Sequence, residues 1–284
     1  MTSQMIVLAI PFPDIDSVAF QFGPVAIKWY GLAYLAGLLL GWFYVRRLLS
    51  QAKLWADEQP PFVPQKVDDL LIYIVLGVLL GGRLGFVLFY EPSYYLENPL
   101  DVFAVWKGGM SFHGGFFGSG VAIWIFSRRN GINPWSTSDL CTAAVPIGIF
   151  FGRVANFING ELFGRPTTMP WGMVFPEAKI HYAAVEPTPR HPSQLYEAVL
   201  EGLVLFIVLR LLTHRYGALK RPGLVTGTFL VGYALARSIA ELFREPHYAH
   251  SLNIEPLTVG IAYSIPMFLL GLFVIYFART QSLK

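Results

Sequence analysis

The sequence predicts an all-α polytopic membrane protein with seven transmembrane helices, and three observations lead to this class. Hydrophobic residues fill 54% of the 284 positions, whereas charged residues account for only 14%. The mean hydropathy of +0.50 is too high for an ordinary soluble domain. Seven separate segments are long and apolar enough to cross a bilayer, which takes roughly 20 residues each.

The spans are expected at residues 24–46, 67–90, 111–128, 137–158, 193–213, 223–243 and 257–278. Residues 5–22 alternate apolar groups with prolines and acids, so we expect an interfacial lead-in there. Pairs of glycines four residues apart, at Gly77/Gly81, Gly114/Gly118 and Gly148/Gly152, predict close contact between helices, because small residues let backbones approach.

The distribution of Lys and Arg predicts the topology. Basic residues follow the first, third, fifth and seventh spans, and the intervening loops are poorer in them. The positive-inside rule then places the N-terminus outside and the C-terminus in the cytoplasm. The proline-rich stretch 161–192 becomes a small extracytoplasmic cap on a single integral membrane domain, residues 1–284.

Composition excludes several classes of function. The net charge is only +3 and no basic run occurs, so we expect no nucleic-acid partner. Cys141 is the single cysteine, which rules out an internal disulfide framework and a cysteine-based metal cluster. Known metal-binding and nucleotide-binding motifs do not stand out, so neither a metal nor a cofactor is predicted.

The stretch from Gly148 to Arg165 carries the densest polar pattern on an apolar background. Arg153, Asn156 and Asn159 follow one another at intervals of three, which places them on one helix face, and Glu161 comes just after. An arginine at the centre of a bilayer costs roughly 2.5–3.5 kcal/mol, which a polar cavity, a partner charge or a ligand must offset. The planar guanidinium suits a phosphate, but an Arg–Glu pair that only fixes helix packing is an equal alternative.

The sixth expected span carries a second charged stripe. Arg237 and Glu241 are one turn apart, and Arg244 lies nearly two turns from Arg237. An internal Arg237–Glu241 ion pair that merely makes the span insertable is the simpler interpretation of this stripe.

Two further residues are candidates with simple alternatives. His113 is followed by two glycines, so a ligand can approach it, and its ordinary pKa of ~6.5 suits proton transfer. A lone histidine is more often bonded to a nearby backbone carbonyl. Tyr30 is either an interfacial anchor or a hydroxyl donor to a lipid headgroup. Residue types and spacing therefore favour an anionic headgroup as ligand, without separating a lipid enzyme from an anion transporter or a structural subunit.

Several motifs together resemble the bacterial prolipoprotein diacylglyceryl transferases. The most specific is Gly-Arg-Val-Ala-Asn-Phe-Ile-Asn-Gly-Glu, residues 152–161, and the others are Ser-Phe-His-Gly-Gly at 111–115, Arg-His-Pro-Ser-Gln-Leu-Tyr-Glu at 190–197, Gly-Gly-Arg at 81–83 and the Arg237, Glu241, Arg244 triplet. The match runs in order from Trp29 to the last span. Ala155 stands where the family usually has glycine, and its small side chain should preserve close packing.

The resemblance implies a seven-span, multi-pass enzyme of the bacterial inner membrane. Its partners would be phosphatidylglycerol, other membrane lipid and a prolipoprotein signal peptide with a lipobox cysteine. It would transfer the diacylglyceryl group to the cysteine thiol and release glycerol phosphate, the first step of lipoprotein maturation. Because the nucleophile belongs to the substrate, the enzyme needs none of its own, and the resemblance implies no metal or cofactor.

The resemblance also implies roles for individual residues. Arg153 and Arg237 would clamp the phosphate, and His113 would be the general base. The expected substrate-binding and orienting residues are Tyr30, Asn156, Asn159, Glu161, Glu241 and Arg244.

Overall fold

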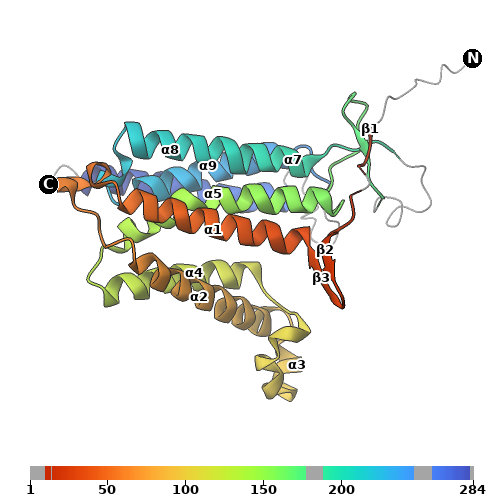
Figure 1. Ribbon diagram of the computed structural model, residues 1–284, viewed down its shortest axis with the longest axis horizontal. Helices are drawn as coiled ribbons and strands as arrows, with labels where there is room; N and C mark the ends of the chain where they lie inside the picture. Colours follow the sequence, from red (N-terminus) through yellow and green to blue (C-terminus); the bar gives the residue numbers. More distant parts are fainter. Residues whose placement is uncertain (1–9, 14, 177–187, 246–257, 282–284) are drawn as a thin grey trace, which may run out of the picture.

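The computed structural model describes residues 10–13, 15–176, 188–245 and 258–281, and long helices make up most of them (Figure 1). The long helices are α1 (Trp29–Leu49), α2 (Lys66–Phe89), α4 (Phe112–Arg129), α5 (Pro134–Ile158), α9 (Leu224–Glu241) and α10 (Val259–Gln281). A further continuous rod consists of α7 (Ser193–Glu197), the π-helical segment η5 (Ala198–Val204) and α8 (Leu205–Arg215).

Each expected span coincides with one of these helical segments, but not all of them qualify as membrane spans. By length and apolar composition, four helices in the described part could cross a membrane: Trp29–Leu49, Lys66–Phe89, Pro134–Ile158 and Gly260–Thr280. The helical interpretation is therefore confirmed for all seven segments, and four of them are candidate membrane spans.

Local sequence sets the helix starts. The Ser111 hydroxyl accepts a hydrogen bond from Gly114 N at 3.2 Å and caps α4. Asn133 caps α5 in the same way through Trp135 N at 2.9 Å, and Pro134 occupies the first turn, where its missing amide hydrogen costs nothing.

Glycines bring α2 and α4 into close contact, as the spacing predicted. A Cβ added at Gly77 or Gly81 would collide with the backbone of Gly118 or Gly114 on α4. Gly37 on α1 likewise approaches Gly148 on α5, because a Cβ added at Gly37 would lie 3.0 Å from Gly148 Cα. Gly152 was the second glycine of the predicted Gly148/Gly152 pair. A Cβ added there would have nothing within 4 Å, so Gly152 does not bring helices together.

The helices form two groups that are visible side by side in Figure 1. Helices α2 and α4 pack mainly on each other, while α5 lies among α1, α8 and α9, and α10 packs along α9. The apolar core joins the C-terminal half of α1 and the first turns of α8 to the N-terminal halves of α5 and α9, with Leu48, Leu140, Leu209 and Val225 fully buried. The opposite half of this bundle is therefore left for polar groups.

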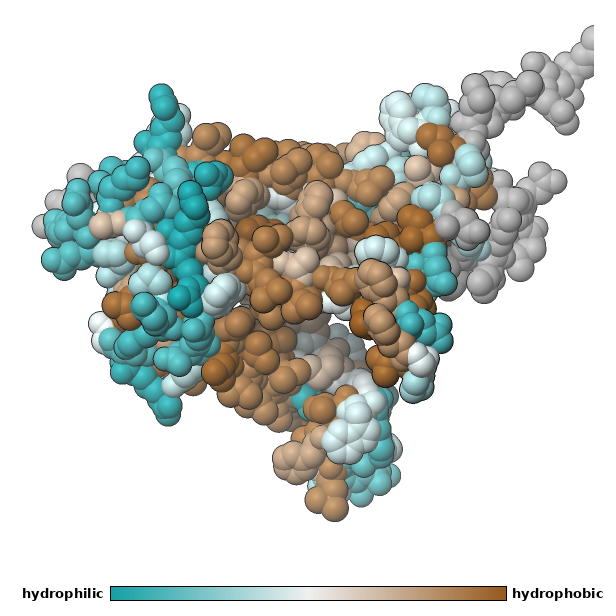
Figure 2. Space-filling model, viewed as in Figure 1, coloured by the Kyte–Doolittle hydropathy of each residue, from teal (hydrophilic) through white to brown (hydrophobic). Residues whose placement is uncertain are grey.

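Apolar side chains cover the outside of the bundle. Figure 2 shows a broad hydrophobic belt between a hydrophilic end, near the C-terminus, and a mixed end, near the cap. Leu39, Phe43, Leu80 and Phe273 are about half or more exposed on different helices. A soluble monomer rarely exposes so continuous an apolar surface, whereas lipid chains would cover it without cost.

Two short sheets correct the expectation of a purely helical fold. Strand β2 (Val18–Phe22) pairs antiparallel with β3 (Val25–Lys28), and β1 (Ile10–Pro11) pairs parallel with β4 (Met173–Val174). Gly23, with φ +57°, makes the tight turn between β2 and β3. The sequence predicted that the first helix begins at residue 24. Because residues 25–28 are extended, it begins at Trp29 instead.

Strand β4 belongs to the expected cap segment, of which residues 177–187 lie outside the described part of the chain. Arg190 forms bridges to Pro166 and Met173 and donates to Gly164 O at 3.2 Å. Phe175 is fully buried against Phe12, with ring centroids 5.2 Å apart. The cap is thus packed onto the end of the bundle where α5 stops and α7 starts.

An arm projects from the end of α2 and consists of α3 (Pro92–Glu97), η3 (Pro99–Phe103) and η4 (Val105–Lys107). Arg83, 4% exposed, fastens it by donating to the carbonyls of Val102 at 2.8 Å, Gly108 at 2.6 Å and Asp101 at 2.5 Å. The Tyr94 hydroxyl, then the Lys107 ammonium, hold the pKa of the Asp101 carboxyl below its usual range.

Candidate functional site: a buried arginine–glutamate cluster

Arg153, on the last third of α5, faces two carboxylates on the neighbouring rod. Its Nε lies 2.8 Å from Glu197 Oε2, and its Nη2 lies 3.3 Å from Glu201 Oε2. Both glutamate side chains have no exposed surface, and that of Arg153 is 19% exposed. The guanidinium therefore uses its fork to bridge two anions, a geometry that the single ammonium of a lysine does not reproduce.

Helix α9 brings a second guanidinium to the same place. Arg237 Nη2 lies 2.5 Å from Glu241 Oε2, so the ion pair expected from the sequence is present. Arg237 Nη1 also lies 3.8 Å from Glu197 Oε1 and 4.0 Å from Glu201 Oε1. Arg237 thus contacts three carboxylates, and pairing along its own helix describes only part of its surroundings.

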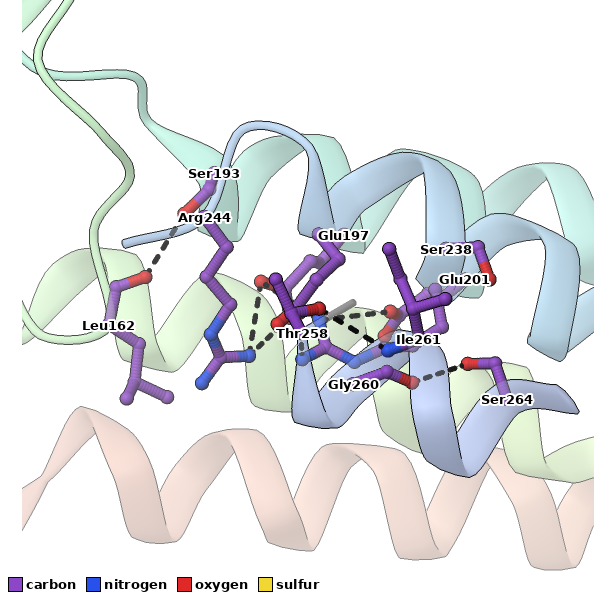
Figure 3. A network of polar contacts seen from close by, with 12 residues as sticks. Leu162, Ser193, Glu197, Glu201, Ser238, Arg244, Thr258, Gly260, Ile261 and Ser264 are labelled. Atoms are coloured by element: carbon purple, nitrogen blue, oxygen red, sulfur yellow. Dashed lines mark hydrogen bonds and ion pairs between the residues drawn. The ribbon is translucent and has the colours of Figure 1, made fainter. Parts of the chain in front are cut away.

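Arg244, just beyond α9, completes the cluster. Its Nη1 lies 3.4 Å from both carboxylate oxygens of Glu197. Figure 3 shows Arg244 extending beside α5 with Nη1 turned toward Glu197. Three arginines, from α5, from α9 and from the segment just after α9, therefore converge on one buried carboxylate, and the predicted stripe of Arg237, Glu241 and Arg244 does lie together.

A π-helical turn shapes the rod at this point. Segment η5 begins immediately after Glu197 and contains Glu201, and single π-turns of this kind are frequent at functional sites. Gly202 within it touches α5, because an added Cβ would lie 2.8 Å from Phe150 Cα. The close approach brings the two glutamates within ion-pairing distance of Arg153, one turn beyond Phe150.

The cluster contains unused hydrogen-bonding capacity. Among the described residues, Arg237 Nη1, Glu201 Oε1 and Glu241 Oε2 are buried without a hydrogen-bond partner. The Arg237–Glu241 pair is short but lacks hydrogen-bond geometry, so we describe it as an ion pair. Unsatisfied buried groups are costly, and in native proteins they point to strain or to a ligand that satisfies them.

The amides of the predicted face bind a different carboxylate. Asn156 Nδ2 donates to Glu161 Oε1 at 2.7 Å, and Asn159 Nδ2 lies at 3.5 Å from the same oxygen. Gln194 donates to the backbone carbonyl of Glu161, which ties this turn to the start of α7. Arg153 does pair with glutamates, the alternative left open from the sequence, but its partners are Glu197 and Glu201 and not Glu161.

His113 and Tyr30 lie apart from these contacts. The exposed His113 ring packs edge-on against Tyr263 of α10, with centroids 5.5 Å apart. Gly260, one turn earlier on α10, abuts the carboxylate of Glu241, so His113 lies on the side of the cluster that α10 borders. The Tyr30 hydroxyl is 3.0 Å from that of Tyr34, at the cap end of α1.

Sequence reasoning assigned no role to Glu197 and Glu201, which the structure places at the centre. Their signal was present, since two acids one turn apart in an apolar segment need partners inside a bundle. Arg190, the first residue of the 190–197 motif, lies in the cap, 2.9 Å from Glu245. Next to it, burial lowers the pKa of His191, whose Nδ1 is 3.0 Å from the Tyr196 hydroxyl.

An apolar groove adjoins the cluster. It has a volume of about 330 Å³ and lies between α1, α5, η5 and α8, with Leu40, Phe43, Tyr44, Ile147, Phe150, Phe151, Leu203 and Phe206 as its lining. Phe150, on the wall of this groove, lies one turn before Arg153 on α5. Within the described ranges, no group of three or more His, Cys, Asp or Glu residues is placed to hold a metal ion.

Fold and site together define a helical membrane protein with an ionisable cluster buried between its helices. The sequence profile of the prolipoprotein diacylglyceryl transferases matches residues 17–277, and the chain belongs to this family. It is 52% identical to the phosphatidylglycerol–prolipoprotein diacylglyceryl transferase of Rhizobium meliloti, over 96% of this chain and 95% of the relative. Identity to the Rhizobium leguminosarum bv. trifolii enzyme of the same name is 50%, over 99% and 98% of the two chains.

Proposed function

We propose that this chain transfers the diacylglyceryl group of phosphatidylglycerol to the lipobox cysteine thiol of a prolipoprotein, forming a thioether and releasing glycerol phosphate. The observation that carries the proposal is the cluster of three guanidinium groups buried beside an apolar groove. It offers cationic donors for the lipid phosphate and an apolar surface for an acyl chain in adjoining places.

Arg153 and Arg237 are our candidates for the phosphate clamp, with Arg244 as a third contact. As the thiolate attacks the glycerol carbon, the bond from that carbon to the phosphate oxygen breaks and negative charge builds up on the leaving phosphate. Guanidinium groups held in advance by Glu197 stabilise this charge with little reorganisation, which is the main source of electrostatic catalysis.

The amide cluster would orient the headgroup next to the clamp. Asn156 and Asn159 hold Glu161 at the end of α5, where the carboxylate can accept hydrogen bonds from glycerol hydroxyls. Tyr30 lies at the same end of the bundle and would donate to the headgroup.

His113 is our candidate for the group that accepts the thiol proton. Its ring is exposed next to Tyr263, and histidine is the side chain that most often serves as a general base. Cys141 packs against the apolar core among the described residues, so the nucleophile is assigned to the substrate.

We propose seven membrane spans, with the N-terminus outside, the C-terminus in the cytoplasm and the chain resident in the bacterial inner membrane as one domain. Support comes from the hydrophobic belt and from the basic loops that follow α1, α4 and α8. The cap, residues 161–192, would then face the extracytoplasmic side. A reporter fused after Lys284 should be active in the cytoplasm, and a signal from outside would refute this topology.

One experiment tests the activity. Purified protein is incubated with phosphatidylglycerol and a lipobox peptide, and mass spectrometry follows the diacylglyceryl adduct. A peptide with Ser in place of Cys is the control, because a hydroxyl is a far weaker nucleophile than a thiolate. No adduct, combined with movement of labelled phosphatidylglycerol between leaflets, would instead indicate a lipid transporter.

A further inference from the structure

The buried cluster is electrically balanced before any lipid enters. Three arginines, Arg153, Arg237 and Arg244, stand within 4.0 Å of three glutamates, Glu197, Glu201 and Glu241. With every group ionised, the sum of these charges is zero. A phosphodiester headgroup adds one negative charge to a site whose side chains are at most 19% exposed. Such an unbalanced charge in a low-dielectric interior is costly.

The three carboxylates differ in how firmly the arginines hold them. Glu197 is approached by all three guanidinium groups, at 2.8, 3.4 and 3.8 Å. Glu241 lies 2.5 Å from Arg237 and retains 10% exposure. Glu201 is fully buried, its nearest arginine nitrogens are 3.3 and 4.0 Å away, and its Oε1 has no hydrogen-bond donor among the described residues.

The groups that face Glu201 come from each element packed on it. They are Arg153 of α5, Arg237 of α9, Tyr233 of α9, which interacts with it electrostatically, and Glu197 on its own rod. When a phosphate takes the guanidinium nitrogens of Arg153 and Arg237, Glu201 loses the two cations that reach it within the described part of the chain and keeps the like charge of Glu197. Protonation then removes the least compensated charge in the cluster.

We propose that Glu201 takes up one proton from solvent when an anionic lipid headgroup binds, and thereby releases Arg153 and Arg237 to the phosphate. The inference rests on the proposed function and concerns the binding step alone, so no bond of the lipid is formed or broken. The neutral carboxylic acid restores the charge balance of the cluster, and the proton returns to solvent when the anionic product leaves.

Calorimetry with a short-chain phosphatidylglycerol measures this proton directly. Binding is followed in two buffers that differ in ionisation enthalpy, and the difference gives the number of protons taken up. Wild-type protein at pH 8 should take up close to one proton per lipid. Its affinity should then fall by about tenfold per pH unit in the alkaline range, as linkage requires for one coupled proton. The Glu201→Gln variant should take up none.

Infrared difference spectra on lipid addition locate the proton. The wild type should gain the carbonyl stretch of a protonated carboxyl group, Glu201→Asp should shift this band, and Glu201→Gln should lack it. Asp139→Asn, at a buried carboxylate on α5 outside the cluster, should keep it. The wild-type proton count and the shift in Glu201→Asp decide the question even if Glu201→Gln does not fold.

The outcomes separate this inference from the proposed function. Transfer of diacylglyceryl by wild-type protein without proton uptake on binding would overturn the proton coupling alone. Proton uptake that persists in Glu201→Gln would overturn the role of Glu201. A carbonyl band that stays unshifted in Glu201→Asp would do the same. Absence of both lipid binding and transfer would overturn the proposed function, and the coupling with it.

Discussion

Arg153 Nε and Glu197 Oε2, on α5 and α7, lie 2.8 Å apart at a carboxylate that has no exposed surface. Arg153 reaches Glu201 with another nitrogen, 3.3 Å from that carboxylate. This one guanidinium joins the helix that carries the most specific motif to the rod that carries both buried acids. Its neighbours therefore decide how the proposed phosphate clamp is built.

Arg153→Lys should reduce transfer even though the charge is kept. A lysine ammonium cannot bridge Glu197 and Glu201 and still present a planar pair of donors to a phosphate. We expect a loss of about a hundredfold to a thousandfold in kcat, typical for removing one transition-state donor. Arg46→Lys, at a partly exposed pair with Asp68, is the matched control and should keep its rate. Wild-type transfer by Arg153→Lys would remove the clamp hypothesis.

Glu197→Ala should destabilise the bundle more than any surface charge change. Removing this carboxylate leaves three arginines around an uncompensated site, and breaking a buried pair in this way costs about 3–5 kcal/mol. The measurement is the thermal unfolding midpoint in detergent. Asp68→Ala, whose side chain is 56% exposed, should change stability by about 1 kcal/mol or less. Equal midpoints for the two variants would contradict the cluster's structural role.

His113→Gln should lower transfer by about a hundredfold to ten-thousandfold. The neutral imidazole accepts the thiol proton as the thiolate attacks, and the loss of such a base typically removes that much of the rate. Glutamine keeps the size and polarity of the side chain but has no basic nitrogen. Cys141→Ala provides a parallel control that should keep full activity, because Cys141 packs against the core. An unchanged rate in His113→Gln would exclude it as the base.

Gly81→Ala should separate α2 from α4. The added methyl would collide with the Gly114 carbonyl and with Gly118, and backbone atoms cannot move aside without shifting a helix. Overpacking of this kind costs about 1–3 kcal/mol, measured as a fall in the unfolding midpoint. Gly120→Ala on α4 has nothing within 4 Å of the new methyl and should leave the midpoint unchanged or slightly higher. If both variants behaved alike, the close helix contact would not matter for stability.

Arg83→Met should loosen the arm. The substitution removes the donors that hold the carbonyls of Val102, Gly108 and Asp101, each a charge-assisted hydrogen bond of about 1.5–3 kcal/mol. We expect faster proteolysis between residues 98 and 110, followed by mass spectrometry of the fragments. Arg128→Met, at an exposed arginine near Trp124, is the control and should cleave as the wild type does. Equal cleavage rates would show that the arm is held by other contacts.

Properties that depend on neighbouring residues could be predicted from the sequence. Hydropathy located all seven helical segments, and glycine spacing identified the contact between α2 and α4. The family could be recognised because its motifs are contiguous, above all residues 152–161. The ion pair of Arg237 with Glu241 was also predictable, since a helix fixes the distance between residues one turn apart. The β2–β3 hairpin was missed because an apolar run of four residues is equally compatible with a strand or the start of a helix.

Only the tertiary structure decided which charges meet. The sequence left open whether Arg153 meets a glutamate or a ligand, and the fold turns it toward Glu197 and Glu201 and leaves Glu161 to Asn156. The reason is that an arginine inside an apolar bundle pairs with whatever carboxylate helix packing brings within reach. That packing depends on close contacts such as Gly202 against Phe150, which join segments far apart in the chain. The sequence by itself determined the membrane class, the helices and the family, and the packing of α5, α7, η5 and α9 determined the buried site.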